Sequence, residues 1–277
     1  MIRYFIITLL AYLLASNIAL AQDRITQLDS TNYKALIKSL PAFTMYGDNY
    51  FVTGTSLNED ISSETSDAKF EIGFKQRLTN LDLPWDMFPF ITYRQKSFWD
   101  IYLESFPFRE TNYNPALGLA KLFVDDEGIK AGLWLSFEHE SNGRDEENSR
   151  SWNYFSLQYF KPFGRKWQFR AKGWIPVGSL ADNSDIISYR GYVAIGATYN
   201  PFRSLFLDID IQPAYDDQLT GFVKAGISFK ISKNSNQFLY IQYFGGYSED
   251  LIDYNQSVSN LRIGIAFKDL FANFLNN

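Results

Sequence analysis

The stretch KFEIGFKQRL, residues 69–78, alternates between apolar and charged side chains. The apolar phase is Phe70, Ile72, Phe74 and Leu78, and the charged phase is Lys69, Glu71, Lys75 and Arg77. A period of two residues is typical of a β-strand whose two faces meet different surroundings. One lipid-like face opposite one charged face predicts a strand in the wall of a membrane barrel.

The same alternation recurs near the C-terminus, in NLRIGIAFKDLF at residues 260–271. Followed along the chain, it predicts strands near 49–55, 69–78, 88–99, 111–124, 129–141, 151–160, 166–174, 189–199, 204–212, 219–231, 237–247 and 260–271. These are twelve, and bacterial outer-membrane barrels have an even number of strands. We therefore expect an all-β protein, a single 12-stranded antiparallel transmembrane β-barrel.

The predicted connections alternate in length. Long polar ones follow odd-numbered strands, at 56–68, 142–150, 175–188 and 248–259. Those after even-numbered strands are mostly short, as in DDEG at 125–128. Outer-membrane barrels have short periplasmic turns and longer extracellular loops, so we expect the long connections outside the cell.

The composition agrees with a barrel. Phe and Tyr number 25 and 18, and such aromatic residues favour strands and form the girdles of outer-membrane barrels. Cysteine is absent, so stability cannot come from disulfides. The net charge of -5 argues against a nucleic-acid partner, and the mean hydropathy of -0.22 excludes a helical membrane protein.

The N-terminus predicts an export signal. MIRYFIITLLAYLLASNIALAQ has one positive charge at Arg3, an apolar run and the small-x-small pattern of Ala19 and Ala21. The alternative, a membrane-spanning helix, fits less well because the apolar run is short and no charged flank follows. We expect residues 1–21 to be a cleaved signal peptide and residues 22–277 to form one domain in the bacterial outer membrane.

Three polar residues lie in the lipid-facing phase of two neighbouring strands. His139 and Ser141 continue the outward phase of Leu135 and Phe137, and Asn153 is outward on the next strand. Polar groups beside hydrocarbon are costly and usually have a function or a partner. We therefore expect these side chains to converge near the extracellular rim.

A hydroxyl, an imidazole and an orienting amide form the arrangement of a serine hydrolase. Serine is a poor nucleophile unless a base removes its proton, and His139, the sole histidine, is the candidate base. Asn153 can orient the imidazole without adding charge beside lipid. The alternative interpretation is that the three are interface residues that share a phase where the strands leave the membrane.

Four motifs resemble the outer-membrane phospholipase A family: HESNGRDEENSRSWN at 139–153, FRETNYNP at 108–115, SEDLIDYN at 248–255 and RIGIAFKDLF at 262–271. Members of that family are calcium-dependent twelve-stranded barrels that dimerise to act. The resemblance spans most of the expected mature chain. It implies a phospholipase that hydrolyses acyl ester bonds of phospholipids and lysophospholipids, with A1/A2 and lysophospholipase activity.

The resemblance also implies roles for individual residues. Ser141 would be the nucleophile, His139 the general base and then acid, and Asn153 the residue that orients His139. The N–H of Gly143 would stabilise the oxyanion together with a calcium ion. The matching calcium ligands are the Arg144 carbonyl, the Ser149 hydroxyl and, from the opposing subunit of a homodimer, Ser105. The dimer-contact glutamine of the family matches Gln95.

Some points stay open. The acids Asp145, Glu146 and Glu147 either strengthen the calcium site or, as charge runs usually do, solvate an exposed loop. The bulky Leu103 and Phe106 beside Ser105, and the six residues after Phe271, depart from what we expect of the family. A passive pore and a catalytically inactive structural or adhesive barrel are the competing functions, but neither explains the outward polar cluster.

Overall fold

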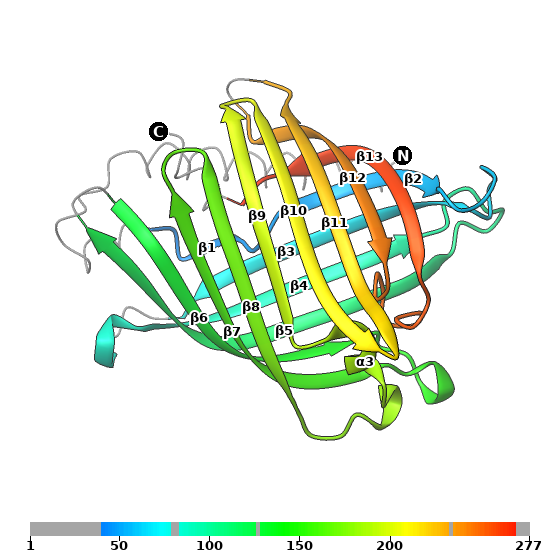
Figure 1. Cartoon of the computed structure of the whole chain (residues 1–277), viewed down its shortest axis with the longest axis horizontal. Helices are drawn as coiled ribbons and strands as arrows, with labels where there is room; N and C mark the ends of the chain where they lie inside the picture. Colours follow the sequence, from blue (N-terminus) through cyan, green and yellow to red (C-terminus); the bar gives the residue numbers. More distant parts are fainter. Residues whose placement is uncertain (1–39, 79–82, 126–127, 233–234, 270–277) are drawn as a thin grey trace, which may run out of the picture.

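The computed structural model describes residues 40–78, 83–125, 128–232 and 235–269, which form a β-barrel (Figure 1). The predicted signal peptide and the segment from Phe271 onward lie outside the described residues. Within the described residues, no helix has the length and apolar composition needed to cross a membrane.

Thirteen strands occur in the described part of the chain. They are β1 Phe43–Met45, β2 Asn49–Ser56, β3 Ser66–Arg77, β4 Phe88–Trp99, β5 Phe108–Asp125, β6 Gly128–Ser141, β7 Ser151–Phe163, β8 Trp167–Val177, β9 Val193–Phe202, β10 Leu205–Asp216, β11 Gln218–Lys230, β12 Gln237–Gly246 and β13 Val258–Phe267. Each strand from β2 to β13 pairs antiparallel with its neighbours, and β13 pairs with β2. The predicted closed 12-stranded antiparallel barrel is confirmed.

The short strand β1 was not predicted, because three residues are too few to show alternation. It pairs with the far part of β3, as in Met45↔Phe74, whereas β2 pairs with the near part, as in Tyr50↔Glu71. Gly47, with φ of +72°, lies between the two strands. Strands β1 and β2 therefore pair one after the other with the same side of β3.

The predicted start of the strand at 189–199 was wrong. Residues Ile186–Arg190 form helix α3, and β9 begins only at Val193. Ile186 is fully buried against Trp152 and Leu251. Packing at the end of the barrel therefore favours a helix over a strand at these residues. Gly191, with φ of +60°, ends it where a Cβ atom would lie 2.2 Å from the Pro213 carbonyl oxygen.

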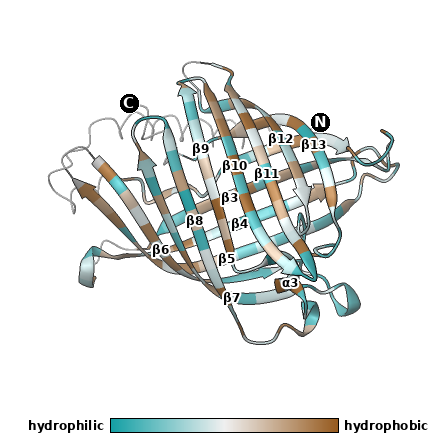
Figure 2. Ribbon diagram, viewed as in Figure 1, coloured by the Kyte–Doolittle hydropathy of each residue, from teal (hydrophilic) through white to brown (hydrophobic). Residues whose placement is uncertain are grey.

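The predicted faces of the strands are confirmed. Leu135 and Phe155 are about half exposed, whereas Lys69, Glu138 and Trp152 are buried. Figure 2 shows hydrophobic and hydrophilic residues alternating along the strands. The outer wall is thus apolar and the lumen polar, which fits a barrel surrounded by lipid.

The two ends of the barrel differ. The connections 57–65, 100–107, 142–150, 178–192 and 247–257 define what we call the loop end. The opposite turn end has short connections such as 164–166 and 203–204. In Figure 1 helix α3 lies at the loop end, away from the β9–β10 turn.

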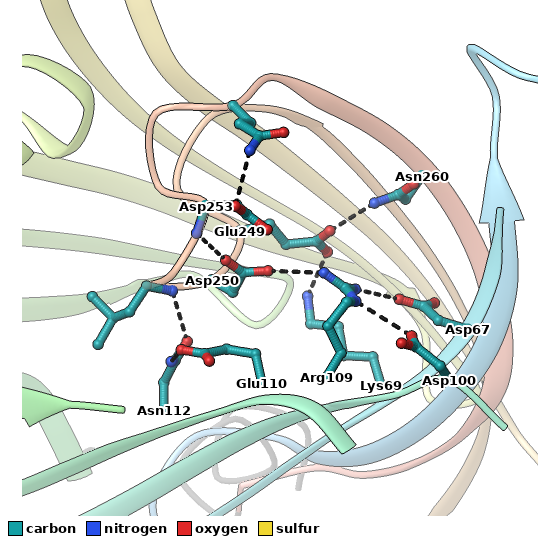
Figure 3. A network of polar contacts seen from close by, with 12 residues as sticks. Asp67, Lys69, Asp100, Arg109, Glu110, Asn112, Glu249, Asp250, Asp253 and Asn260 are labelled. Atoms are coloured by element: carbon teal, nitrogen blue, oxygen red, sulfur yellow. Dashed lines mark hydrogen bonds and ion pairs between the residues drawn. The ribbon is translucent and has the colours of Figure 1, made fainter. Parts of the chain in front are cut away.

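A buried charge network fills the lumen at the loop end (Figure 3). The β12–β13 connection carries Glu249, which pairs with Lys69 at 2.9 Å and Arg262 at 2.7 Å. It also carries Asp250, which pairs with Arg109 at 3.3 Å. Arg109 further contacts Asp67 and Asp100. The network ties this connection to the barrel wall.

An apolar cluster lies beside this network and consists of Trp152, Tyr154, Trp174, Ile186, Leu251 and Tyr254. A cavity of about 360 Å³ remains in the lumen, lined by charged residues such as Glu71, Arg94 and Lys224. The inward side chains therefore interlock across the loop end.

Candidate active site

His139 and Asn153 form a cross-strand pair on β6 and β7, close to the loop end. Nδ1 of His139 lies 2.9 Å from Oδ1 of Asn153. Both side chains are partly exposed and belong to the outward phase of their strands. The structure thus brings these two predicted residues together on the lipid-facing wall.

This hydrogen bond determines which ring nitrogen of the His139 imidazole carries the proton. An amide oxygen can only accept a hydrogen bond, so the proton lies on Nδ1 of His139. Nε2 of the neutral ring is then left with its lone pair free. The pair is therefore arranged so that His139 can accept a proton at Nε2.

Ser141 follows His139 by two residues on the same face of β6, about 7 Å along the strand. It is paired with Ser151 of β7 and Tyr113 of β5. In the described chain its hydroxyl makes no side-chain hydrogen bond. Contacts between nucleophile and base are often long in free enzymes and tighten when substrate binds.

The residues that alternate with the predicted site residues along β6 point into the lumen. Glu140 accepts a hydrogen bond from Trp152 Nε1 at 3.0 Å and pairs with Arg190 at 3.1 Å. Glu138 accepts a hydrogen bond from the Tyr154 hydroxyl at 2.9 Å. The alternation of the strands therefore places the polar site outside the barrel and its buried supports inside.

The β6–β7 connection is organised by Asn142, which is buried. Its amide nitrogen donates to the Asn148 carbonyl at 2.9 Å, and its oxygen accepts from the backbone N–H groups of Arg144 and Arg150. Gly143 has φ of +67°, a conformation that favours glycine. The predicted oxyanion residue thus lies in a defined turn two residues after Ser141.

Two of the predicted calcium ligands, Arg144 and Ser149, lie in the same connection. The Ser149 hydroxyl donates to Oδ2 of Asp182 at 3.3 Å, and the Ser151 hydroxyl donates to the same oxygen at 3.0 Å. The side chain of Arg144 pairs with Glu110 at 3.0 Å. Within the described residues, no cluster of three or more His, Cys, Asp or Glu side chains could hold a metal ion. The hydroxyls of Ser149 and Ser151 beside the Asp182 carboxylate are nevertheless hard oxygen donors of the kind that calcium prefers.

Asp182 was missed by the sequence analysis. It belongs to the β8–β9 connection, in the short helix Ala181–Asn183, and nothing in its local pattern distinguishes it from other loop acids. Asn183 beside it accepts a hydrogen bond from the backbone of Ser151 at 3.0 Å. Only the packing of two loops brings this carboxylate to Ser149.

Asp145, Glu146 and Glu147 are exposed, as expected of a solvated loop. Ser105 is exposed in the β4–β5 connection, and no hydrogen bond joins it to Arg144 or Ser149 in the described chain. The structure of one chain therefore does not bring Ser105 into the site.

Gln95 is on β4 in a ladder of polar side chains. Its oxygen accepts from the Tyr93 hydroxyl at 2.9 Å, and its nitrogen donates to the Ser97 hydroxyl at 3.2 Å. Thr111 donates to the same Ser97 hydroxyl at 3.1 Å. The amide thus has partners within its own chain, and it retains one N–H and one lone pair for another contact.

Comparison with known proteins gives a consistent result. The profile of the family described as phospholipase A1 matches residues 19–267. The phospholipase A1 proteins of Klebsiella pneumoniae and Escherichia coli are each 35% identical to this chain over 186 residues, which is 65% of the chain. The match covers 63% and 62% of those relatives, so the chain spans less than two thirds of their length.

Two solved structures have the same fold. The Salmonella typhi outer-membrane phospholipase dimer with bound calcium is 28% identical, has a TM-score of 0.71, and is matched over 82% of this chain and 94% of that chain. Outer-membrane phospholipase A from Escherichia coli is 29% identical, has a TM-score of 0.73, and is matched over 83% of this chain and all of that chain.

Proposed function

This chain belongs to the phospholipase A1 family and is an outer-membrane β-barrel, and on that premise we propose that it is a calcium-dependent phospholipase that hydrolyses acyl ester bonds of phospholipids and lysophospholipids. The observation that carries the proposal is the hydrogen bond between His139 and Asn153 on the outer wall, with Ser141 on the same face. A hydroxyl, an imidazole and an amide on a lipid-facing surface suit acyl transfer from a lipid.

In the proposed reaction, Oγ of Ser141 attacks the ester carbonyl carbon while Nε2 of His139 takes the hydroxyl proton. Asn153 keeps the proton on Nδ1 and holds the ring while it is positively charged. His139 then gives the proton to the leaving alcohol oxygen, which leaves an acyl group on Ser141. Water, activated by His139, releases the fatty acid.

The negative charge on the carbonyl oxygen needs hydrogen-bond donors or a cation. Gly143 supplies the candidate backbone N–H in the turn after Ser141. The Arg144 carbonyl, the Ser149 hydroxyl and the neighbouring Asp182 would hold calcium, which when bound supplies positive charge to stabilise the oxyanion. Asp182 adds the carboxylate that neutral ligands lack, which strengthens the fit.

The apolar wall below the site supports a lipid substrate. Phe137 and Phe155 are exposed and lie edge to face, with ring centroids 5.4 Å apart. Leu135 and Leu157 continue this surface towards the middle of the barrel. A phospholipid in the surrounding leaflet can therefore lay its acyl chains along the wall and reach the site with its ester group.

We also propose that the active form is a homodimer. A relative crystallised as a calcium-bound dimer, and Gln95 on β4 retains unused hydrogen-bonding capacity on the outer face. A second copy would pair with Gln95 and bring Ser105 to the calcium ligands. Cross-linked monomer that is as active as dimer at saturating calcium would contradict this part of the proposal.

The test is fatty-acid release from a phospholipid in detergent micelles by refolded protein, with calcium and then with chelator. We expect calcium-dependent release that is lost in Ser141→Ala. The matched control is Ser204→Ala, at the turn end, which should keep full activity. No release from folded, dimeric protein would favour the alternative, a catalytically inactive structural or adhesive barrel.

A further inference from the structure

Asn114 contacts the backbone of His139 from inside the barrel. It is on β5, and its side chain is buried in the lumen. Its amide nitrogen donates to the carbonyl oxygen of His139 at 3.0 Å and lies 3.3 Å from the Tyr154 hydroxyl, to which it also donates. A lumenal side chain thus reaches the main chain of the residue whose imidazole faces outward.

The neighbouring residue explains why this contact is needed. Strands β5 and β6 pair as Tyr113↔Ser141 and Ala116↔Glu138, a register that places Pro115 opposite His139. Proline has no N–H and cannot donate to the facing carbonyl. In a membrane barrel, backbone groups must be satisfied within the protein, so the His139 carbonyl needs another donor.

The Asn114 amide is part of a longer buried chain of contacts. The Tyr154 hydroxyl donates to Glu138 Oε2 at 2.9 Å, and Lys172 pairs with Glu138 Oε1 at 2.6 Å. Glu138 precedes His139 on β6, and Tyr154 follows Asn153 on β7. The chain therefore holds both strands of the site directly behind the residues that face lipid.

Resting on the function proposed above, we propose that Asn114 is a positioning residue for His139. Its side-chain amide replaces the ladder hydrogen bond that Pro115 cannot make. The amide thereby holds the His139 backbone in place opposite Asn153 of β7. Without it, β6 is free to shift at this interruption of the β5–β6 ladder, which lies directly beside His139. A misplacement of about 1 Å can lower a rate about 100-fold, so a smaller shift is expected to have a graded effect.

The first test compares the kinetics of three variants. Asn114→Ala removes the donor, and we expect kcat to fall about tenfold with KM nearly unchanged, because Asn114 does not touch substrate. Asn114→Asp keeps the shape without an N–H donor and should fall similarly. In the double variant Asn114→Ala with Pro115→Ala, the new alanine N–H can donate to the His139 carbonyl, and we expect most of the lost kcat to return.

The matched control is Asn200→Ala at the turn end. Asn200 is also buried, and its amide nitrogen donates to the carbonyls of Phe202 and Leu205 at 2.7 and 2.6 Å. This variant should affect stability at most and leave kcat per folded molecule unchanged. Equal losses of kcat in Asn200→Ala and Asn114→Ala, or no recovery in the double variant, would overturn the proposal.

A spectroscopic readout separates this proposal from the proposed enzyme activity. His139 is the only histidine, so selective ¹⁵N labelling gives the imidazole signals of a single residue. We expect Asn114→Ala to reduce the fraction of the Nδ1–H form and the double variant to restore it. If wild-type protein releases no fatty acid, the proposed function fails, while this shift still supports the positioning role. Unchanged imidazole signals in Asn114→Ala would refute that role.

Discussion

Replacing Asn153 by alanine tests how the amide supports His139. The bond between Nδ1 of His139 and Oδ1 of Asn153 is 2.9 Å long. When the imidazole becomes positively charged in the transition state, the same bond becomes charge-assisted and contributes about 1.5–3 kcal/mol. Each 1.36 kcal/mol is about tenfold in rate, so we expect Asn153→Ala to lower kcat about 10- to 150-fold.

The assay is fatty-acid release in micelles at saturating calcium and substrate, with the amount of folded protein verified for each variant. KM should change little, because this bond strengthens only in the transition state. Ser141→Ala should lose far more activity than Asn153→Ala. A fall in kcat of less than about threefold, or a loss as complete as that of Ser141→Ala, would refute an orienting role for the amide.

Three further predictions concern stability and the oxyanion site. Arg262→Met removes four hydrogen bonds to two buried carboxylates that keep other cationic partners, so the free energy of unfolding in lipid vesicles should fall by about 2–4 kcal/mol. Burial alone would raise the pKa of Glu249, but Lys69 and Arg262 hold that pKa below its ordinary value. The stabilisation by Glu249 is therefore present above the unfolded-state pKa of about 4.3 and is lost as pH falls towards the folded-state pKa. We expect the free energy of unfolding to fall more between pH 7 and pH 3 in the wild type than in Glu249→Gln. Gly143→Ala strains a residue at φ of +67° and puts a Cβ atom 3.2 Å from the Tyr113 ring. We expect the kcat of this variant to fall about tenfold or more while the protein still folds. A fully active variant would exclude Gly143 from the oxyanion site.

The outward site residues and their inward supports alternate along β6. His139 and Ser141 face lipid, while Glu138 and Glu140 face the lumen and hold charged or hydroxyl partners there. A catalytic group keeps its geometry when buried contacts restrain the chain around it. A closed barrel therefore offers a rigid platform for a site on its outer surface, where few other elements could support it.

Alternation along the chain was sufficient to predict most of the strands and their two faces. Successive side chains of a strand point to opposite sides, so the phase of His139 could be followed from that of Leu135 and Phe137 without any knowledge of the fold. Cross-strand proximity of Asn153 followed from the order of the strands, because consecutive strands of an antiparallel barrel are neighbours. The roles of Gly143, Arg144 and Ser149, in contrast, came from resemblance to a family, because nothing in the alternation points to them.

The contacts between distant segments became visible only in the folded barrel. It placed Asp182 beside Ser149, the connection 247–257 inside the lumen, and α3 where alternation predicted a strand. It also set the register that leaves the His139 carbonyl facing Pro115 and in reach of Asn114. Alternation is a local property of a strand, whereas register and loop packing depend on how the whole barrel closes and fills its interior, and no single segment encodes that.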